Sequence, residues 1–379
     1  IWNFLLKKKN KNIIKNFKSL VREYHQGDQL LNSLSNNYNY SFKKKILSKF
    51  KKEKTFKVIG MGGSILGSEA IHSFLKCKKK FYFINNLQNS IKNIKKKSST
   101  NIIISKSGNT LEMILNVNLY LKKKDKNIII TEKSNNYLFN LANKLKCEII
   151  EHNNFIGGRY SVLSEVGMVP AILMGYDEKK FKQFNNLIKN KIFVKKLIHN
   201  VEQTLYFSKK KFNSIILNYD EKSEDLFKWY QQLIAESLGK KAKGILPIVS
   251  SMPKDNHSVM QFYLDGPKKN FFTFYYVFSK NSSKINNKMI LPSHKYLRSR
   301  TLEQILYSQK LATEKTFIKK KLPFRSFEIL KRDEKTIGEL FCFFILETIL
   351  LGKALKINPF DQPSVELIKN ETKKILLRN

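Results

Sequence analysis

The sequence of 379 residues predicts an α/β protein with two domains, each built on a parallel sheet sandwiched by helices. Three observations support this fold class. Short apolar strands alternate with helical patterns, the alternation occurs twice along the chain, and the hydrophobic content of 42% is ordinary for a globular protein. Strands that are connected through helices form βαβ units, in which the strands run parallel. A chain of this length is sufficient for two medium-sized domains with cores of their own.

The first alternating series follows a helical N-terminal segment. Residues 1–50 carry apolar positions at helical spacing among Lys and Asn, so we expect helices that pack on the body of the protein. Residues 51–178 form the first predicted domain. Its expected strands are 56–59, 81–84, 101–104, 127–130 and 147–150, and its clearest helices are 65–75 and 111–122.

The second series begins after a break near residues 178–200, which are rich in Lys and Asn. Residues 200–352 form the second predicted domain, and residues 353–379 form a C-terminal helical segment that opens with a turn. The expected strands are 213–218, 245–249, 271–278 and 325–330, and the expected helices are 223–238, 256–264, 301–317 and 336–352.

The composition is strongly basic, with a formal net charge of +41. Binding to nucleic acid or to an anionic membrane would explain this charge. Codon bias explains it as well, because Lys, Asn and Ile are enriched together and share A/T-rich codons. Aromatic residues do not interleave with the lysine runs, so we expect a solvated surface and no specific nucleic-acid partner. The short runs are Lys7–Lys9, Lys43–Lys45, Lys95–Lys97, Lys122–Lys124 and Lys319–Lys321.

Cysteine usage and apolar runs indicate a cytoplasmic protein. The three cysteines have no metal or redox spacing, and this low, odd count suits a reducing compartment. Residues 1–6 lack the long apolar core and the cleavage site of a signal peptide. The longest apolar run, Leu340–Leu351, is too short to span a bilayer and contains Glu347, so we expect a buried helix and no membrane partner.

The turn between strand 101–104 and helix 111–122 predicts an anion site. Its residues are Ser105-Lys106-Ser107-Gly108-Asn109-Thr110. A helix N-terminus offers free N–H groups and a positive dipole end, and neighbouring hydroxyls add donors. Such a turn most often binds a phosphate. We therefore expect this chain to hold a small phosphorylated molecule.

A second glycine-rich turn, Gly60-Met61-Gly62-Gly63-Ser64, ends strand 56–59. It lacks the third glycine of a dinucleotide fingerprint and the lysine of a P-loop. Tight-turn chemistry alone would explain the glycines. However, both turns follow strands of one predicted parallel sheet, and ligands bind at the carboxyl ends of such strands. We therefore expect the backbone at Gly63 and the hydroxyl of Ser64 to approach a ligand.

Three ionisable residues lie in motifs where either chemistry or a structural role is plausible. Arg159 follows Gly157-Gly158, which is typical either of a loop ion pair or of a fixed guanidinium aimed at developing negative charge. Glu236 lies in the last turn of helix 223–238, where the dipole disfavours an acid, and is a candidate general base or a surface residue. His257 follows the expected carboxyl end of a strand, where ligands bind, although a lone histidine is more often structural or exposed.

Taken together and in this order, the motifs resemble the glucose-6-phosphate isomerase (phosphoglucose isomerase) family, bacterial branch, from roughly Phe56 to Lys369. The resemblance implies two sugar-isomerase (SIS) domains and a homodimer. It also implies interconversion of glucose 6-phosphate and fructose 6-phosphate through an enediolate, with neither cofactor nor metal. The expected partner is therefore a small hexose 6-phosphate.

The resemblance also assigns the site residues. The phosphate-binding group is Ser64, Ser105, Lys106, Ser107 and Thr110. Further pocket residues are Gly63, Glu112, Gly158, Gln232 and Gln362. Glu236 matches the catalytic base and Arg159 the residue that stabilises the enediolate. His257 and Lys369 match the ring-opening residues, and the resemblance implies that His257 reaches the active site of the neighbouring subunit.

Other functions are consistent with parts of the pattern. A related enzyme could also act on mannose 6-phosphate. A non-catalytic sugar-phosphate-binding protein with SIS domains would keep the turn at 105–110, but it would not need Glu236, His257 and Lys369 together. A nucleic-acid binder driven by charge would show salt-sensitive retention of DNA.

Overall fold

The computed structural model describes residues 10–87, 99–122, 125–211 and 213–378. The N-terminal stretch judged to lack a signal peptide lies outside the described residues. So do the lysine runs 7–9 and 95–97 and the end of the run 122–124. Among the described helices, none is long and apolar enough to cross a membrane.

The first sheet has five parallel strands in the order β2-β1-β3-β4-β5. They are β1 (Thr55–Ile59), β2 (Lys80–Ile84), β3 (Thr100–Ile104), β4 (Lys126–Thr131) and β5 (Glu148–Glu151). Each lies within one residue of its predicted bounds. Side chains on both faces are buried: Ile102 and Ile104 enter the main core, and Ile103 enters a cluster on the opposite face. Burial on two faces explains why these strands read as continuous apolar runs.

The second sheet has four parallel strands in the order β7-β6-β8-β9. They are β6 (Asn213–Asn218), β7 (Leu246–Ser251), β8 (Asn270–Val277) and β9 (Phe324–Ile329). One face contributes Phe272 and Phe274 to a cluster with Phe317, which lies on helix α14 (Leu302–Lys319). Two parallel sheets flanked by helices confirm the predicted fold class.

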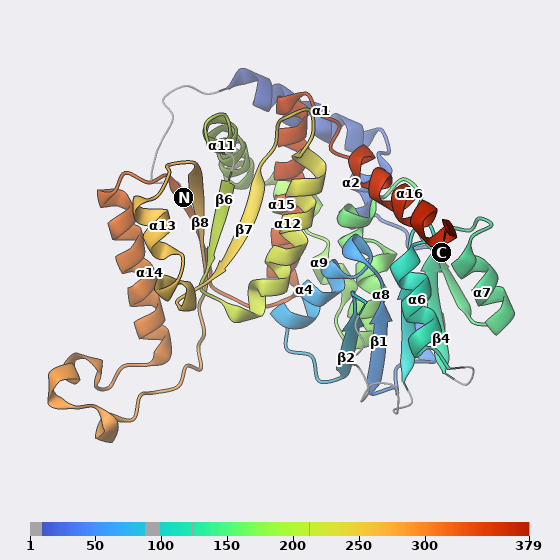
Figure 1. Ribbon diagram of the computed structural model, residues 1–379, viewed down its shortest axis with the longest axis horizontal. Helices are drawn as coiled ribbons and strands as arrows, with labels where there is room; N and C mark the ends of the chain where they lie inside the picture. The colour runs from blue at the N-terminus through green and yellow to red at the C-terminus, as the bar shows by residue number, and fades with distance from the viewer. Residues whose placement is uncertain (1–9, 88–98, 123–124, 212, 379) are drawn as a thin grey trace.

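Helices α4 (Leu66–Phe74), α12 (Glu224–Leu238) and α15 (Glu334–Leu355) lie between the two sheets (Figure 1). Most of α15 is buried, as expected for the longest apolar run. Its one buried acid, Glu347, accepts a hydrogen bond of 3.3 Å from Arg325 of β9. A buried carboxylate needs such a partner, because an unpaired charge in the core is costly.

The carboxyl edges of the two sheets point in opposite directions. Ser73 near the end of α4 donates to Asp225 in the first turn of α12, whereas Leu66 at the start of α4 and Glu236 near the end of α12 line one cavity. The two helices are therefore antiparallel. Each begins near the carboxyl edge of its own sheet, so the two carboxyl edges lie at opposite ends of the helical layer (Figure 1).

The interval between the two predicted domains is largely helical and packs against α15. It contains α9 (Glu178–Phe181), α10 (Phe184–Lys189) and α11 (Lys191–Ser208). The Lys and Asn residues that gave the appearance of a break alternate with apolar side chains that are buried. These are Phe181, Phe184, Leu187 and Leu197.

The remaining elements complete the covering layers. At the N-terminus the expected helices pack on the body and bury Ile13 and Leu20. The helices are α1 (Lys11–His25), α2 (Gln29–Ser33), α3 (Lys44–Ser48), α6 (Leu111–Tyr120), α7 (Tyr137–Leu145), α8 (Glu165–Met174), α13 (Met260–Asp265) and α16 (Pro363–Arg378). The 3₁₀ turns are η1 (Gly62–Ser64), η2 (Gly158–Leu163), η3 (Glu221–Ser223), η4 (Lys254–His257), η5 (Asn287–Met289) and η6 (Pro292–Leu297).

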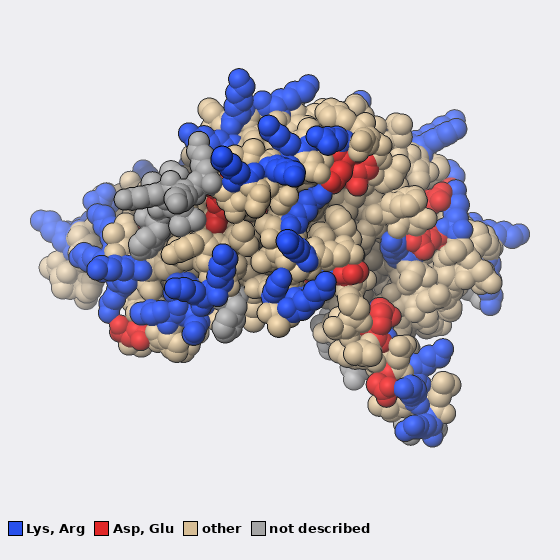
Figure 2. Space-filling view, turned by 90° about the horizontal axis from the view of Figure 1, so that it is seen from above, with Lys and Arg blue, Asp and Glu red and all other residues tan. Residues whose placement is uncertain are grey.

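The basic residues are distributed over the face of the molecule that Figure 2 shows. Figure 2 shows Lys and Arg in several groups across one face of the molecule, with Asp and Glu between them, and not in a single groove. A surface that binds a nucleic-acid backbone carries its positive charge as one patch or stripe. The distribution on this face agrees with the expectation of a solvated basic surface.

Candidate active site

The turn at residues 105–110, which the sequence predicts to bind an anion, is held by its own hydrogen bonds at the N-terminus of α6, and we call it the cradle. Ser105 is 3% exposed, and its Oγ lies 3.1 Å from Thr110 Oγ1 and accepts a hydrogen bond of 3.2 Å from the Gly108 amide. Gly108 has a φ of +65°, and a Cβ there would lie 1.9 Å from Asn136 Oδ1. Only glycine fits this position. Local bonds therefore hold the cradle in shape.

The remaining residues that were predicted to bind phosphate lie in or beside this turn. The Lys106 ammonium donates to the Asn154 carbonyl at 2.6 Å and lies 3.8 Å from Glu132, so the chain's own groups hold it. Ser107 is exposed. Ser64 lies in η1, which follows β1, the sheet neighbour of β3. The carboxyl ends of adjacent parallel strands share one edge, so the two turns are neighbours. Glu112 lies half-buried in the first turn of α6.

The two glycine motifs pack directly against each other. A Cβ on Gly63 would lie 2.2 Å from the Gly158 carbonyl carbon and 2.4 Å from the Arg159 nitrogen. A Cβ on Gly62 would lie 2.8 Å from Gln232 Nε2. The sequence predicted that this turn approaches a ligand. The structure shows that the lack of a side chain at Gly63 allows η1 to meet η2, which sets the position of Arg159.

Arg159 is the centre of the site and joins three separate parts of the chain. Its Nε donates to Ser237 Oγ at 2.8 Å, and its Nη1 donates to Glu236 Oε1 at 3.0 Å and to Gln362 Oε1 at 2.9 Å. Its Nη2 donates to the carbonyls of Pro359 at 2.7 Å and Asp361 at 3.1 Å. These five bonds match the five N–H groups of a guanidinium. The side chain is 3% exposed and fully engaged.

Glu236 is held by one partner on each carboxylate oxygen. Arg159 binds Oε1, and Gln232 Nε2 donates to Oε2 at 2.9 Å. The side chain is 23% exposed and lines a cavity of about 600 Å³ together with Gln232 and Gln362. Small-molecule sites commonly have volumes of about 300–1,000 Å³. The structure therefore places an oriented carboxylate at the wall of a cavity of suitable size.

His257 lies far from Glu236 in the folded chain. It is exposed in η4, directly after the carboxyl end of β7. Helix α12 also begins near this sheet edge and runs away from it. Glu236 comes twelve residues after Glu224, the first residue of α12, which is roughly 18 Å along a helix. His257 and Glu236 thus lie towards opposite ends of α12.

Lys369 does not line the cavity at Glu236. It is exposed on α16, a helix without buried residues, and its Nζ donates to Glu366 Oε1 at 2.6 Å. The described residues that line the cavity include Gln362, Pro363, Ser364 and Val365 from this part of the chain, but not Lys369. The helix that carries Lys369 therefore begins at the cavity wall and leads away from it.

Sequence reasoning missed three residues that organise the site, although all three lie inside its motifs. Lys240 donates to the carbonyls of Asn358 and Asp361 and to the Asp361 carboxylate, and this hydrogen bond lowers the pKa of Asp361. Ser237 and Tyr160 bond to Arg159 and to Pro359, respectively. We call residues 358–362 the C-terminal strap. The role of its carbonyls could not be predicted from the sequence, because every residue carries the same backbone acceptor.

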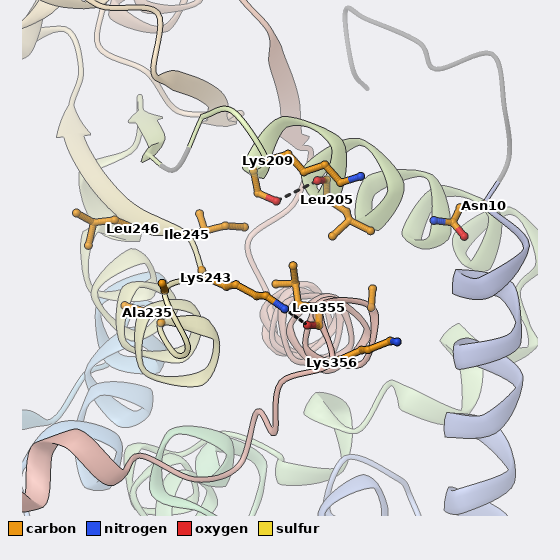
Figure 3. A pocket seen from close by; sticks show the side chains of 14 residues that line it. Asn10, Leu205, Lys209, Ala235, Lys243, Ile245, Leu246, Leu355 and Lys356 are labelled. Carbon is orange, nitrogen blue, oxygen red and sulfur yellow. Dashed lines mark hydrogen bonds between the residues drawn. The ribbon is translucent and has the colours of Figure 1, made fainter.

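A larger cavity lies on the other side of the last turn of α12. Its volume is about 920 Å³, and it shares Ala235 and Gly239 with the cavity at Glu236. Figure 3 shows its mainly aliphatic wall and Lys243, whose Nζ donates to the Leu355 carbonyl at 3.1 Å. None of the predicted site residues lines it. The chemistry of the lining, and not the volume, therefore identifies the candidate active site.

The fold and the site together define a class. Two parallel sheets flanked by helices, a predicted anion-binding turn at one sheet edge, and buried Arg159 paired with half-buried Glu236 at a helix end fit the class of proteins with sugar-isomerase domains that the sequence led us to expect. A family model described as "Phosphoglucose isomerase" matches residues 6–250. The chain belongs to the phosphoglucose isomerase family.

Relatives and solved structures agree with this assignment. The chain is 33% identical over 347 residues to a glucose-6-phosphate isomerase of Methanocaldococcus jannaschii, which covers 85% of this chain and 83% of the relative. A hypothetical protein of Thermus thermophilus has the same fold with a TM-score of 0.84 at 21% identity, over 97% and 95% of the two chains. A glucose-6-phosphate isomerase of Chlamydia trachomatis gives 0.67 at 17% identity, over 92% and 78%.

Proposed function

We propose that this chain interconverts glucose 6-phosphate and fructose 6-phosphate as an aldose–ketose isomerase. The observation that carries the proposal is the 3.0 Å contact between Arg159 and Glu236 at the wall of the 600 Å³ cavity. Membership of the phosphoglucose isomerase family and the printed names of the relatives support the same reaction. By resemblance, the reaction needs neither a cofactor nor a metal.

The isomerisation moves one proton between C1 and C2 of the open-chain sugar. The cradle at residues 105–110 anchors the 6-phosphate, so that binding energy remote from the reacting carbons orients them. Glu236 takes the proton from C2 of the aldose and returns it to C1, and a positioned base of this kind contributes about 10²–10⁴-fold. Negative charge develops on the enediolate oxygen, and the fixed positive charge of Arg159 stabilises it.

We further propose that a homodimer completes the site. Ring opening moves a proton between O1 and O5, and an imidazole suits this step at neutral pH. Within one subunit His257 and Glu236 lie towards opposite ends of α12, which supports a site that takes His257 from the neighbouring subunit. Lys369, on exposed α16, would then assist once the segment after the strap moves toward the sugar.

The other functions are less well supported. A non-catalytic binding protein has no need for a carboxylate held on both oxygens, as Glu236 is. Activity on mannose 6-phosphate remains an alternative that differs only in the configuration at C2. We propose a cytoplasmic location, supported by three free cysteines and by the hexose phosphate substrate.

A coupled assay tests the proposed function. The purified chain with fructose 6-phosphate is expected to form glucose 6-phosphate, which glucose-6-phosphate dehydrogenase converts with the release of NADPH. The rate should be the same with and without a chelator. A parallel reaction with mannose 6-phosphate distinguishes the bifunctional alternative. If no glucose 6-phosphate forms, the proposed function is wrong.

Replacing Ser105 and Thr110 together by Ala should raise the Michaelis constant for fructose 6-phosphate at least about tenfold. This change corresponds to the loss of one or two hydrogen bonds to a charged group, each about 1.5–3 kcal/mol. The turnover number should change less, because the hydroxyls act on the phosphate and not on C1 or C2. Steady-state kinetics measure both constants. An unchanged Michaelis constant would contradict the assignment of the cradle.

A further inference from the structure

A closed ring of hydrogen bonds lies behind Arg159, on the side away from Glu236. Arg159 Nε donates to Ser237 Oγ at 2.8 Å, and Ser237 Oγ lies 2.8 Å from Tyr160 Oη. Tyr160 Oη donates to the Pro359 carbonyl at 3.0 Å, and Arg159 Nη2 donates to the same carbonyl at 2.7 Å. The ring joins η2, α12 and the C-terminal strap. Ser237 and Tyr160 have no exposed surface.

The direction of each bond in the ring follows from its members. A carbonyl only accepts, so the Tyr160 proton points at Pro359. Burial raises the pKa of Tyr160 to about 12, which keeps this proton in place at neutral pH. Tyr160 Oη then accepts from Ser237, and Ser237 Oγ accepts from Arg159 Nε. Each hydroxyl donates once and accepts once, so the ring is satisfied without water.

We infer that Tyr160 and Ser237 are positioning residues that hold the guanidinium plane of Arg159 with Nη1 toward Glu236 and Gln362. This inference rests on the proposed function. The ring binds Nε and Nη2 of Arg159, and two bound nitrogens fix the plane of the guanidinium. In this orientation Nη1 lies 3.0 Å from Glu236 Oε1 and 2.9 Å from Gln362 Oε1. Neither Tyr160 nor Ser237 is among the described residues that line the cavity, so they act through Arg159.

A lost ring bond should affect turnover more than binding. The phosphate cradle lies on another element and keeps its own local bonds. In contrast, a broken ring leaves Arg159 less firmly placed beside Glu236. A misplacement of about 1 Å at a reacting centre lowers the rate on the order of 10²-fold. Tyr160→Phe is therefore expected to lower kcat for fructose 6-phosphate about 10- to 100-fold, with KM within about twofold.

Tyr219→Phe is the matched control for Tyr160→Phe. Tyr219 is 3% exposed and donates to Thr313 Oγ1 at 3.0 Å, within the cluster on the outer face of the second sheet. Each variant removes one buried hydroxyl that donates one hydrogen bond, and the Tyr160 hydroxyl also accepts one from Ser237. We expect both variants to lower the melting temperature and Tyr160→Phe alone to lower kcat. A kcat for Tyr160→Phe within twofold of wild type, or an equal fall for Tyr219→Phe, would overturn the inference.

Ser237→Ala provides a second and independent test. Either substitution alone breaks the ring of hydrogen bonds. The second substitution should therefore add little to the first, and the effects of Tyr160→Phe and Ser237→Ala on kcat should be strongly non-additive. If the decreases in kcat caused by the two substitutions are additive, Tyr160 and Ser237 do not act together through the ring. Wild-type protein without isomerase activity would refute the proposed function and the inference with it. An active wild type with an unimpaired Tyr160→Phe variant would refute the inference alone.

Discussion

Glu236→Gln is expected to lose nearly all turnover of fructose 6-phosphate, by about 10²–10⁴-fold, because an amide cannot accept the proton from C2. Binding of the phosphosugar should persist, since the cradle at residues 105–110 is on a different element. Coupled kinetics measure turnover, and calorimetric titration with a non-reacting hexitol 6-phosphate measures binding.

The site should accept the Glu236→Gln change without unfolding. Gln at this position still offers an oxygen to Arg159 Nη1. Its amide nitrogen would face Gln232, whose buried Oε1 has no hydrogen-bond partner among the described residues. A flip of the Gln232 amide turns this oxygen toward the new donor. The buried contacts are therefore retained.

Glu371→Gln is a suitable control for the charge change, because Glu371 is exposed on α16 and pairs with Lys374 only through a surface contact. It should keep wild-type kinetics. If Glu236→Gln retains more than about a tenth of the wild-type turnover, the assignment of the base is wrong.

A heterodimer of one Glu236→Gln subunit and one His257→Ala subunit should recover about half of the wild-type activity per dimer. Each parent homodimer should be nearly inactive. If His257 serves the neighbouring active site, one site of the heterodimer receives both defects and the other receives neither. Two different affinity tags and sequential purification isolate the mixed dimer, and the coupled assay measures its rate.

A heterodimer assembled from two differently tagged Glu236→Gln subunits controls for the tags and for subunit exchange, and it should stay inactive. If the mixed dimer is as inactive as its parents, Glu236 and His257 act within one subunit. That result would contradict the shared site. A wild-type chain that is active as a monomer, as judged by sedimentation, would contradict it as well.

Much of the fold could be predicted because its signals are local. The strands β1, β3 and β4 are buried on both faces, so their apolar runs mark them directly. The cradle at residues 105–110 is also local, since a strand end, a required glycine and a helix start follow one another in the chain. The interval near residues 178–200 was harder to interpret, because its buried side chains lie among many lysines.

The arrangement around Arg159 could not be predicted from local signals. Its partners Glu236 and Gln362 are 77 and 203 positions away in the chain. Two of its five acceptors are backbone carbonyls of the C-terminal strap, which carry no sequence signature. The support by Ser237, Tyr160 and Lys240 arises only when η2, α12 and the strap are packed together.

Two parallel sheets, a turn suited to an anion and a set of candidate residues could be predicted from the chain, because each depends on residues that are near one another in the sequence. Which of these residues meet depends on how the helices pack. The antiparallel packing of α4 and α12 places Glu236 beside Arg159 and directs the carboxyl edge of the second sheet, with His257, the opposite way. Helix packing of this kind depends on the fit of many side chains at once, which no single stretch of sequence contains.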